Sequence, residues 1–326
     1  MKNLGRLAAL AGLAAAIWLV WRGHPEVALR LLRTAGWGLL LAAVAHVLPM
    51  LANARDWQII ILSRRRPGLW RMLGLVWLRE SINNLLPVAR VGGEVAAFRA
   101  MRRQGLSGAT IVGSLIVDTQ LTLISQVLFT VAGIGYLLAH SNSTSLRLAG
   151  HLAWGVAGLT PLLVVFCLIQ RASPFERATR VLNRFLGGRL TALVGESAQI
   201  DELIRRTWRR RWIIVQYIFV WQTLQCVGIA FELWLALRFM HVHLSLVACF
   251  VFESLIQAIS SAAFFVPANL GIQEGGFVLI GGALGLASPA ALALAGARRI
   301  RDLVIFVPGL LWWQWTESHQ PVSRKT

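Results

Sequence analysis

The chain has 326 residues, of which 56% are hydrophobic and only 14% are charged, and its mean hydropathy is +0.63. A soluble domain carries about 25% charged residues, so this composition excludes an ordinary soluble enzyme and indicates a polytopic membrane protein. The formal net charge of +18 would suit a nucleic-acid-binding protein. The basic residues, however, gather between apolar stretches, as they do in cytoplasmic loops that face anionic lipid. We therefore expect no nucleic-acid partner.

The N-terminal region contains the first apolar stretch, residues 4–21. It resembles a signal peptide, but no small-x-small cleavage site precedes Trp21, so we expect an uncleaved anchor helix within residues 1–35. A helix needs about 20 mostly apolar residues to cross a bilayer. The same criterion predicts further spans over 36–54, 109–139, 150–170, 213–238 and 290–316.

Two other apolar stretches, 69–104 and 244–287, are interrupted by proline, glycine and polar residues. Irregular backbone at membrane depth has to be buried in protein or face water, so we expect a re-entrant hairpin in each. Glu94 and Glu274 each follow a proline by seven positions and lie 180 residues apart. The residues expected to break these helices are Pro87, Gly92, Gly93, Pro267 and Gly271.

Loop charge predicts the orientation. Residues 55–71 hold five Arg and one Asp, and residues 171–211 hold ten Arg and four acids, so both should be cytoplasmic. The loops 140–147 and 240–243 are short and nearly uncharged, which suits the outside. With the loops assigned in this way, the predicted topology has both termini in the cytoplasm of an inner-membrane protein. It also makes the first hairpin enter from the inside and the second from the outside.

The fold class expected from these patterns is an all-α polytopic membrane protein with about six spanning helices and two broken hairpins. Inverted repeats with broken helices are a recognised transporter architecture. The predicted organisation comprises an N-terminal anchor, repeat 1, a connecting span with a basic stretch, repeat 2 and a tail. Their bounds are 1–35, 36–139, 140–212, 213–316 and 317–326.

The basic stretch 171–211 mixes apolar and basic residues. One interpretation is a basic amphipathic helix that contacts anionic lipids of the inner leaflet. The other is a connecting loop that only enforces topology. Either form is compatible with a monomer or a homo-oligomer.

Charged residues within apolar segments cost at least about 2.5–3.5 kcal/mol each on insertion scales, so each needs a reason. Arg298, Arg301 and Asp302 share one helical face, whereas Arg299 points elsewhere. We expect Arg298 and Arg301, in preference to Arg299, to bind an anionic head group or to pair with one of the carboxylates Glu94, Glu274 and Asp118. The alternatives are a closed network of ion pairs and glutamates that only cap helices. The candidate head-group or switching residues are Glu94, Asp118, Glu274, Arg298, Arg301, Asp302, Arg90, Asn269 and Gln273.

Motifs of catalysis and cofactor binding give no support for an enzyme. The sequence has no Ser/His/Asp set, no HExxH and no GxxxxGK[ST] motif. The three cysteines and seven histidines show no metal-ligand spacing. We expect no catalytic residue, no metal and no cofactor. A membrane enzyme of lipid-linked group transfer and a scaffold for lipid-biosynthesis enzymes remain as alternatives to transport.

Several segments resemble the lysylphosphatidylglycerol-synthase transmembrane, flippase-like superfamily. In the first half these are residues 84–94 and 117–122, and in the second half 266–276, 297–303 and 308–311. The second-half segments are similar to the hopanoid-associated HpnL branch. The resemblance implies a lipid transporter whose cargo is a hopanoid or a phospholipid-like lipid. In some relatives an appended soluble synthase makes an aminoacylated phospholipid. We see no such domain here and expect no synthase activity.

Overall fold

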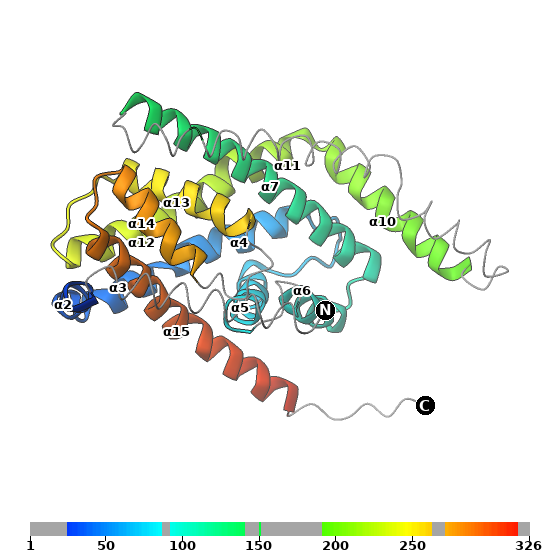
Figure 1. Cartoon of the computed structure of the whole chain (residues 1–326). Helices are drawn as coiled ribbons and strands as arrows, with labels where there is room; N and C mark the ends of the chain where they lie inside the picture. Colours follow the sequence, from blue (N-terminus) through cyan, green and yellow to red (C-terminus); the bar gives the residue numbers. More distant parts are fainter. Residues whose placement is uncertain (1–24, 87–91, 141–149, 151–190, 263–270, 319–326) are drawn as a thin grey trace, which may run out of the picture.

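The computed structural model describes residues 25–86, 92–140, 150, 191–262 and 271–318 (Figure 1). The described part of the chain forms helices and no strand, which confirms the expected all-α class. The predicted span 4–21 and almost all of the predicted span 150–170 lie outside the described residues. So do four of the residues predicted for the site or the hairpins, namely Pro87, Arg90, Pro267 and Asn269.

The first half of the described chain contains a short helix that the sequence patterns did not predict, followed by the expected ones. Their bounds are α2 (Pro25–Ala35), α3 (Gly38–Ala45), α4 (Val47–Ile60), α5 (Leu69–Leu85), α6 (Gly92–Arg103) and α7 (Gly108–Ala139). The helix α4 continues to Ile60 because Trp57, Ile59 and Ile60 pack into an apolar core. Asp56, which the charge count placed in a cytoplasmic loop, therefore lies on a buried helical turn.

The second half begins with a helix at the end of the basic stretch and then repeats the order of the first half. Its elements are α10 (Thr191–Arg209), α11 (Arg211–Gln216), the π-helical turn η1 (Tyr217–Gln222), α12 (Thr223–Phe239), α13 (Leu246–Ala262), α14 (Ile272–Ala283) and α15 (Ser288–Ser318). Of the two interpretations of the stretch 171–211, its described part agrees with the helical one, since residues 191–209 form α10.

Three described stretches are long and apolar enough to cross a membrane, by length and composition. They are Gly38–Ile60, Gly108–Ala139 and Arg211–Phe239. The helix α15, with 31 residues, is also long enough. It is not among the three because it carries a cluster of charges, Arg298 to Asp302.

Two units of the fold follow the same local pattern at an offset of 180 residues. The helices α6 and α14 begin and end at equivalent positions, and α7 and α15 begin at equivalent positions. Between them, Gly105 and Gly285 both have φ of +84°, the left-handed conformation in which glycine ends a helix. The following N–H group bonds back to the preceding helix in both cases, from Leu106 to Met101 and from Leu286 to Gly281.

Each of the two units, α4–α7 and α12–α15, packs one of its helices against a long helix of the other unit. The helix α5 packs against α6 of its own unit and against α15 of the other. In the same way, α13 packs against α14 and against α7. In Figure 1, α7 and α15 run in opposite directions on the two flanks of the bundle. Each unit therefore packs against the other in a corresponding way, whereas the inverted-repeat relation and the orientation in the membrane stay predictions.

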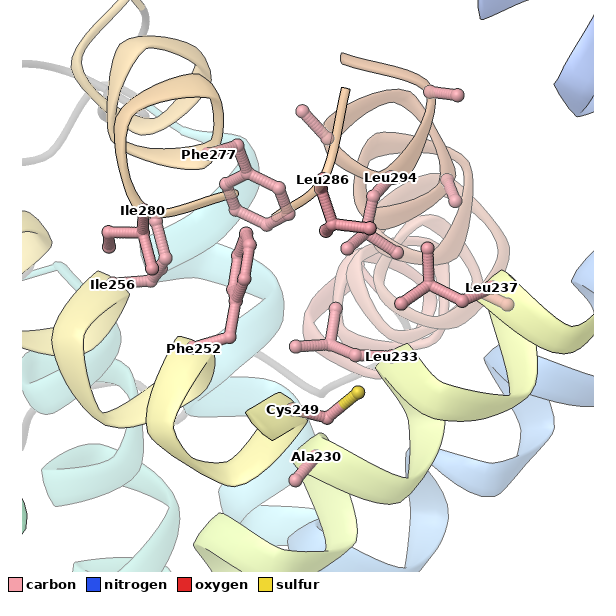
Figure 2. Packing of buried hydrophobic residues seen from close by; sticks show 14 of the residues in the cluster. Ala230, Leu233, Leu237, Cys249, Phe252, Ile256, Phe277, Ile280, Leu286 and Leu294 are labelled. Carbon is pink, nitrogen blue, oxygen red and sulfur yellow. The ribbon is translucent and has the colours of Figure 1, made fainter. Parts of the chain in front are cut away.

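Each unit has its own apolar core. In the second unit, Phe252 of α13 meets Phe277 of α14 edge to face, with ring centroids 5.0 Å apart (Figure 2). The core on the side of the first unit is built around Trp57 and Met72 and also includes Tyr217 of η1. Because lipid is as apolar as these side chains, such packing is held by van der Waals contact and by polar interactions between helices. Polar side chains gather between the two cores.

Candidate functional site

A cavity of about 480 Å³ lies between the two units and is lined by residues of α4 to α7 and of η1 to α15. This volume falls in the range of about 300–1,000 Å³ that is usual for small-molecule sites. The charged or titratable side chains in its wall are His46, Arg79, Glu80, Glu94, Asp118, Glu253, Arg298, Arg299, Arg301 and Asp302. Amide side chains border it as well, namely Asn53, Asn83, Asn84, Gln126, Gln222, Gln225, Gln257 and Gln273.

On the side of the first unit, Asp118 of α7 is held on both of its carboxylate oxygens. Arg79 Nη1 of α5 donates to Oδ2 at 2.8 Å, and Tyr217 Oη donates to Oδ1 at 2.7 Å. The second guanidinium nitrogen of Arg79 donates to Asn53 Oδ1 at 3.0 Å. The guanidinium carbon lies 4.6 Å from the centre of the Trp57 ring, which adds a cation–π contact. Arg79 and Asp118 therefore form a buried, well-oriented pair.

On the side of the second unit, Arg298 of α15 bonds to Glu253 of α13. Its guanidinium carbon lies 5.2 Å from the centre of the Phe277 ring. Gln257, one turn along α13, donates to Glu253 Oε1 at 2.9 Å. Both members of the pair are almost fully buried, with side chains 7% and 2% exposed.

A third cluster joins the junction of α3 and α4 to α12 and α15. Arg301 Nη1 lies 3.3 Å from Glu232 Oε2, and Arg301 Nη2 lies 2.8 Å from Asp302 Oδ1. His46 Nδ1 lies 2.7 Å from Glu232 Oε2 and 2.6 Å from Arg301 Nη1. The His46 ring also packs edge to face on Phe306, with centroids 5.8 Å apart. This cluster ties the first unit to the second.

Glu274 lies behind the wall of the cavity and combines two roles. Its Oε2 accepts the Gly271 N–H at 2.7 Å, which caps the start of α14. Its Oε1 accepts from Arg299 Nη2 at 2.9 Å and Nε at 3.1 Å. Although helical periodicity sets Arg299 apart from the face of Arg298 and Arg301, its long side chain also borders the cavity. The capping interpretation and the ion-pair interpretation of Glu274 therefore both hold.

Among the described residues of the cavity wall, Glu94 and Glu80 are carboxylates that accept no hydrogen bond from an arginine. Glu94 lies in the first turn of α6, with its side chain 37% exposed and its Oε2 4.0 Å from Arg79 Nη1. That oxygen has no hydrogen-bond partner among the described residues. Glu80 Oε1 accepts from Asn53 Nδ2 at 2.9 Å, and its Oε2 lies 3.9 Å from His46 Nε2.

Carboxylates outnumber guanidinium groups at this site. The described residues of the three ion-paired clusters and of the cavity wall include four arginines, each bonded to a carboxylate: Arg79, Arg298, Arg299 and Arg301. The same region holds seven carboxylates: Glu80, Glu94, Asp118, Glu232, Glu253, Glu274 and Asp302. The described part of the site is therefore acidic before His46 is counted.

The structure brings most of the predicted site residues together. The predicted residues that line the cavity are Glu94, Asp118, Gln273, Arg298, Arg301 and Asp302. Gly92 begins α6, and Gly93 N–H donates to Asn83 Oδ1 at 2.9 Å, which fixes α6 against α5. Gly271 precedes α14 with φ of +78°. Arg90 and Asn269 lie outside the described residues.

Five important residues were not among the predicted set: His46, Arg79, Glu80, Glu232 and Glu253. Arg79, Glu80 and Glu253 were visible in the sequence as charged interruptions of the predicted hairpins. His46 and Glu232 each stand alone in a predicted span, so the cost of burying a lone charge was the signal that could have found them. No group of three or more His, Cys, Asp or Glu side chains in the described ranges is arranged to hold a metal ion.

Comparison with known proteins bears on the family. No curated protein and no solved structure matched the chain. A family model described as "Lysylphosphatidylglycerol synthase TM region" matches residues 6–309, which is most of the chain. The chain therefore belongs to the family of lysylphosphatidylglycerol synthase transmembrane regions.

Proposed function

We propose that this membrane protein is a lipid transporter of the flippase-like type. Its cargo is a hopanoid or a related amphipathic lipid, which it moves across or out of the inner membrane. The head group occupies the cavity between the two units, and the apolar part stays in the bilayer. The observation that carries the proposal is a cavity of about 480 Å³, lined by charged and amide side chains of both units, inside an all-α membrane protein.

Charges in such a protein need a polar environment, because an ionised side chain exposed to hydrocarbon is costly. Ion pairing alone would satisfy them in a closed, dry interface. Here the pairs of Arg79 with Asp118 and of Arg298 with Glu253 instead stand in the wall of a cavity. A polar space at the interface of two repeat units is where secondary transporters bind their substrates.

The acidic surplus indicates the chemistry of the head group. Every arginine among the described residues of the wall is already bonded to a carboxylate, so an anionic group would have to displace one there. Glu94, in contrast, has a side chain that is 37% exposed, and its Oε2 lies 4.0 Å from Arg79 Nη1 without a hydrogen bond to it. A head group with hydroxyl or ammonium donors fits this arrangement, since carboxylates accept hydrogen bonds and do not donate them. This favours a polyol or amine head group over the anionic one that the arginines suggested.

The packing between the two units indicates how they could move relative to each other during transport. Because α5 packs on α15 and α13 on α7, each unit meets the other along two long helices. Rocking of one unit against the other along these surfaces would expose the cavity to each side in turn. The sequence has no GxxxxGK[ST] motif for binding a nucleotide. The transport cycle would therefore run on an ion gradient or on mass action.

Exposed arginines of α10 and of the start of α11 support a position of these helices against the anionic inner leaflet. Four arginines at their junction are exposed: Arg206, Arg209, Arg210 and Arg211. Glu202, one turn before them, bonds to Arg206 Nε at 2.7 Å and to Arg205 Nη2 at 2.9 Å. These two guanidinium groups hold the pKa of Glu202 below its usual value. A polybasic segment next to a spanning helix is attracted to anionic lipids.

The test is movement of lipid by the purified full chain in phosphatidylglycerol–phosphatidylethanolamine vesicles. The probes are a fluorescent phospholipid and a radiolabelled hopanoid polyol. We expect the wild type to move the polyol faster than empty vesicles do, and Glu94→Gln to reduce the rate toward that of empty vesicles. Glu202→Gln, an exposed carboxylate on α10, is the matched control and should keep the wild-type rate.

Two outcomes would contradict the proposal. Equal rates for the wild type and empty vesicles with both probes would exclude transport of these lipids. A lipid recovered with a modified head group, detected by mass spectrometry, would instead favour an enzyme of group transfer. Loss of function only when the arginines of 206–211 are neutralised, with Glu94→Gln active, would favour a scaffold.

A further inference from the structure

Asp56 is a buried carboxyl group behind the cavity wall that none of the ion pairs uses. It lies on α4 and is 0% exposed. Gln222 of η1 donates its Nε2 hydrogen to Asp56 Oδ2 at 2.7 Å. The other oxygen, Oδ1, is buried and has no hydrogen-bond partner in the described part of the chain.

The cations near Asp56 are engaged elsewhere. The neighbouring Arg55 bonds to Gln58 and lies over the Trp221 ring, 5.8 Å from its centre. Arg79 of α5, which also faces Asp56, is bonded to Asp118 of α7. Among the described residues, Asp56 also faces Asp118 and the Tyr217 hydroxyl of η1, which donates to Asp118. The Arg79–Asp118 pair is neutral in sum, so it leaves a charge on Asp56 uncompensated.

The π-helical turn η1 connects Asp56 to the cavity. A π turn inserts an extra residue into a helix, and such turns are frequent at functional sites. Here η1 carries both Tyr217, which bonds to Asp118, and Gln222, which bonds to Asp56. Gln222 also borders the cavity and donates to Gln225 Oε1 at 3.1 Å, so one amide stands between Asp56 and the cavity.

An ionised carboxylate is very costly in a low-dielectric interior without a cation and a full set of donors, and such a group binds a proton instead. We propose that Asp56 is a proton-binding site and that Gln222 couples its protonation to the occupant of the cavity. In the conformation described here Asp56 is the neutral acid. The Gln222 N–H favours the ionised form of Asp56, so a ligand that draws this amide away makes Asp56 hold its proton more tightly, and ligand and proton bind together. The coupling rests on the proposed transport function, whereas proton binding does not.

The first test measures the proton directly, by infrared spectroscopy of the full chain in vesicles. The sequence has four aspartates, Asp56, Asp118, Asp201 and Asp302, so ¹³C labelling of the aspartate carboxyl carbon restricts the signal to these. Asp118 and Asp302 each form an ion pair with an arginine, whereas Asp56 forms none. At neutral pH we expect an isotope-shifted carbonyl band of a neutral carboxylic acid, absent in Asp56→Asn and retained in Asp302→Asn.

The wild-type spectrum decides the matter even where a variant folds poorly. Absence of an isotope-shifted neutral-acid band at neutral pH would show Asp56 ionised and would overturn the proposal. A band that persists in well-folded Asp56→Asn would assign the proton to another aspartate and would overturn it as well.

The second test addresses the coupling in proteoliposomes. Transport of the hopanoid polyol should depend on pH in the wild type, and this dependence should vanish in Asp56→Asn. If no lipid moves but the band is present in the wild type and lost in Asp56→Asn, the proton site stands and the transport function fails. If lipid moves with the same pH dependence in the wild type and in Asp56→Asn, the coupling to Asp56 is refuted.

Discussion

Asp118 and Arg298 occupy equivalent positions of α7 and α15, 180 residues apart, and each is ion-paired to the hairpin helix of its own unit with the charges exchanged. Arg79 of α5 holds Asp118, and Glu253 of α13 holds Arg298. The two units thus carry an ion pair at the same position of α7 and α15 with the polarity reversed, although the partners Arg79 and Glu253 are 174 residues apart and do not occupy equivalent positions.

Removal of one member of the Arg298–Glu253 pair should be strongly destabilising. Glu253→Gln leaves the buried Arg298 guanidinium without its counter-charge, and breaking a buried pair in this way costs about 3–5 kcal/mol. The double variant Glu253→Gln/Arg298→Gln removes both charges and should cost less than the sum of the two single changes. The measurement is a double-mutant cycle on the free energy of unfolding in detergent. Strict additivity of the two changes would show that the pair contributes no coupling.

Gly93 should be intolerant of any side chain. A Cβ atom at this position would overlap the Arg79 carbonyl oxygen and Asn83 Oδ1, where α6 begins against α5. Gly93→Ala should therefore destabilise the protein by about 1–3 kcal/mol through overpacking. Gly74→Ala on α5 is the matched control, because nothing lies within 4 Å of its Cβ position. It should be neutral or stabilising by about 0.5–1 kcal/mol. Thermal unfolding in detergent compares the two, and equal effects would refute the close approach.

The Tyr217 hydroxyl should contribute to stability through Asp118. The bond from Oη to Asp118 Oδ1 is 2.7 Å long and buried. Tyr217→Phe leaves that carboxylate oxygen without its donor and should cost about 1.5–3 kcal/mol. The sequence has two tyrosines, and Tyr136→Phe serves as the control, since its ring stacking on His140 survives the change. That control should shift the free energy of unfolding by less than about 0.5 kcal/mol. If Tyr217→Phe were as stable as the control, the hydrogen bond from Tyr217 to Asp118 would make no contribution to stability.

Cysteines placed in two exposed turns should react with an impermeant reagent from opposite sides of the membrane. Arg65 lies in the turn after α4 and His241 in the turn after α12, and both are exposed. The charge distribution predicts that Arg65 is cytoplasmic and His241 is outside. A membrane-impermeant maleimide should label His241→Cys in intact cells and Arg65→Cys only after permeabilisation, above the background of the wild type. Labelling of both from the same side would overturn the predicted topology.

The sequence by itself determined the class of the protein and the positions of its breaks. Hydropathy and charge patterning are local properties, so they identified an all-α membrane protein and the apolar stretches from which α3–α4, α7 and α11–α12 form. Proline, glycine and the 180-residue offset located both interrupted hairpins, because the cost of irregular backbone at membrane depth acts on each segment separately. The same cost marked Glu94, Asp118 and Arg298 as residues that need a polar partner.

Only the tertiary structure decided which charges meet. His46 and Glu232 are 186 residues apart, and His46 and Arg301 are 255 apart, so no local periodicity relates them. The burial of Asp56 and the pairing of Arg299 with Glu274 likewise follow from neighbouring helices that cover those side chains. A charged side chain in an apolar helix indicates that a polar or oppositely charged partner exists. The partner's identity depends on how the two units pack, because ion pairs form through space between helices that are distant in the chain.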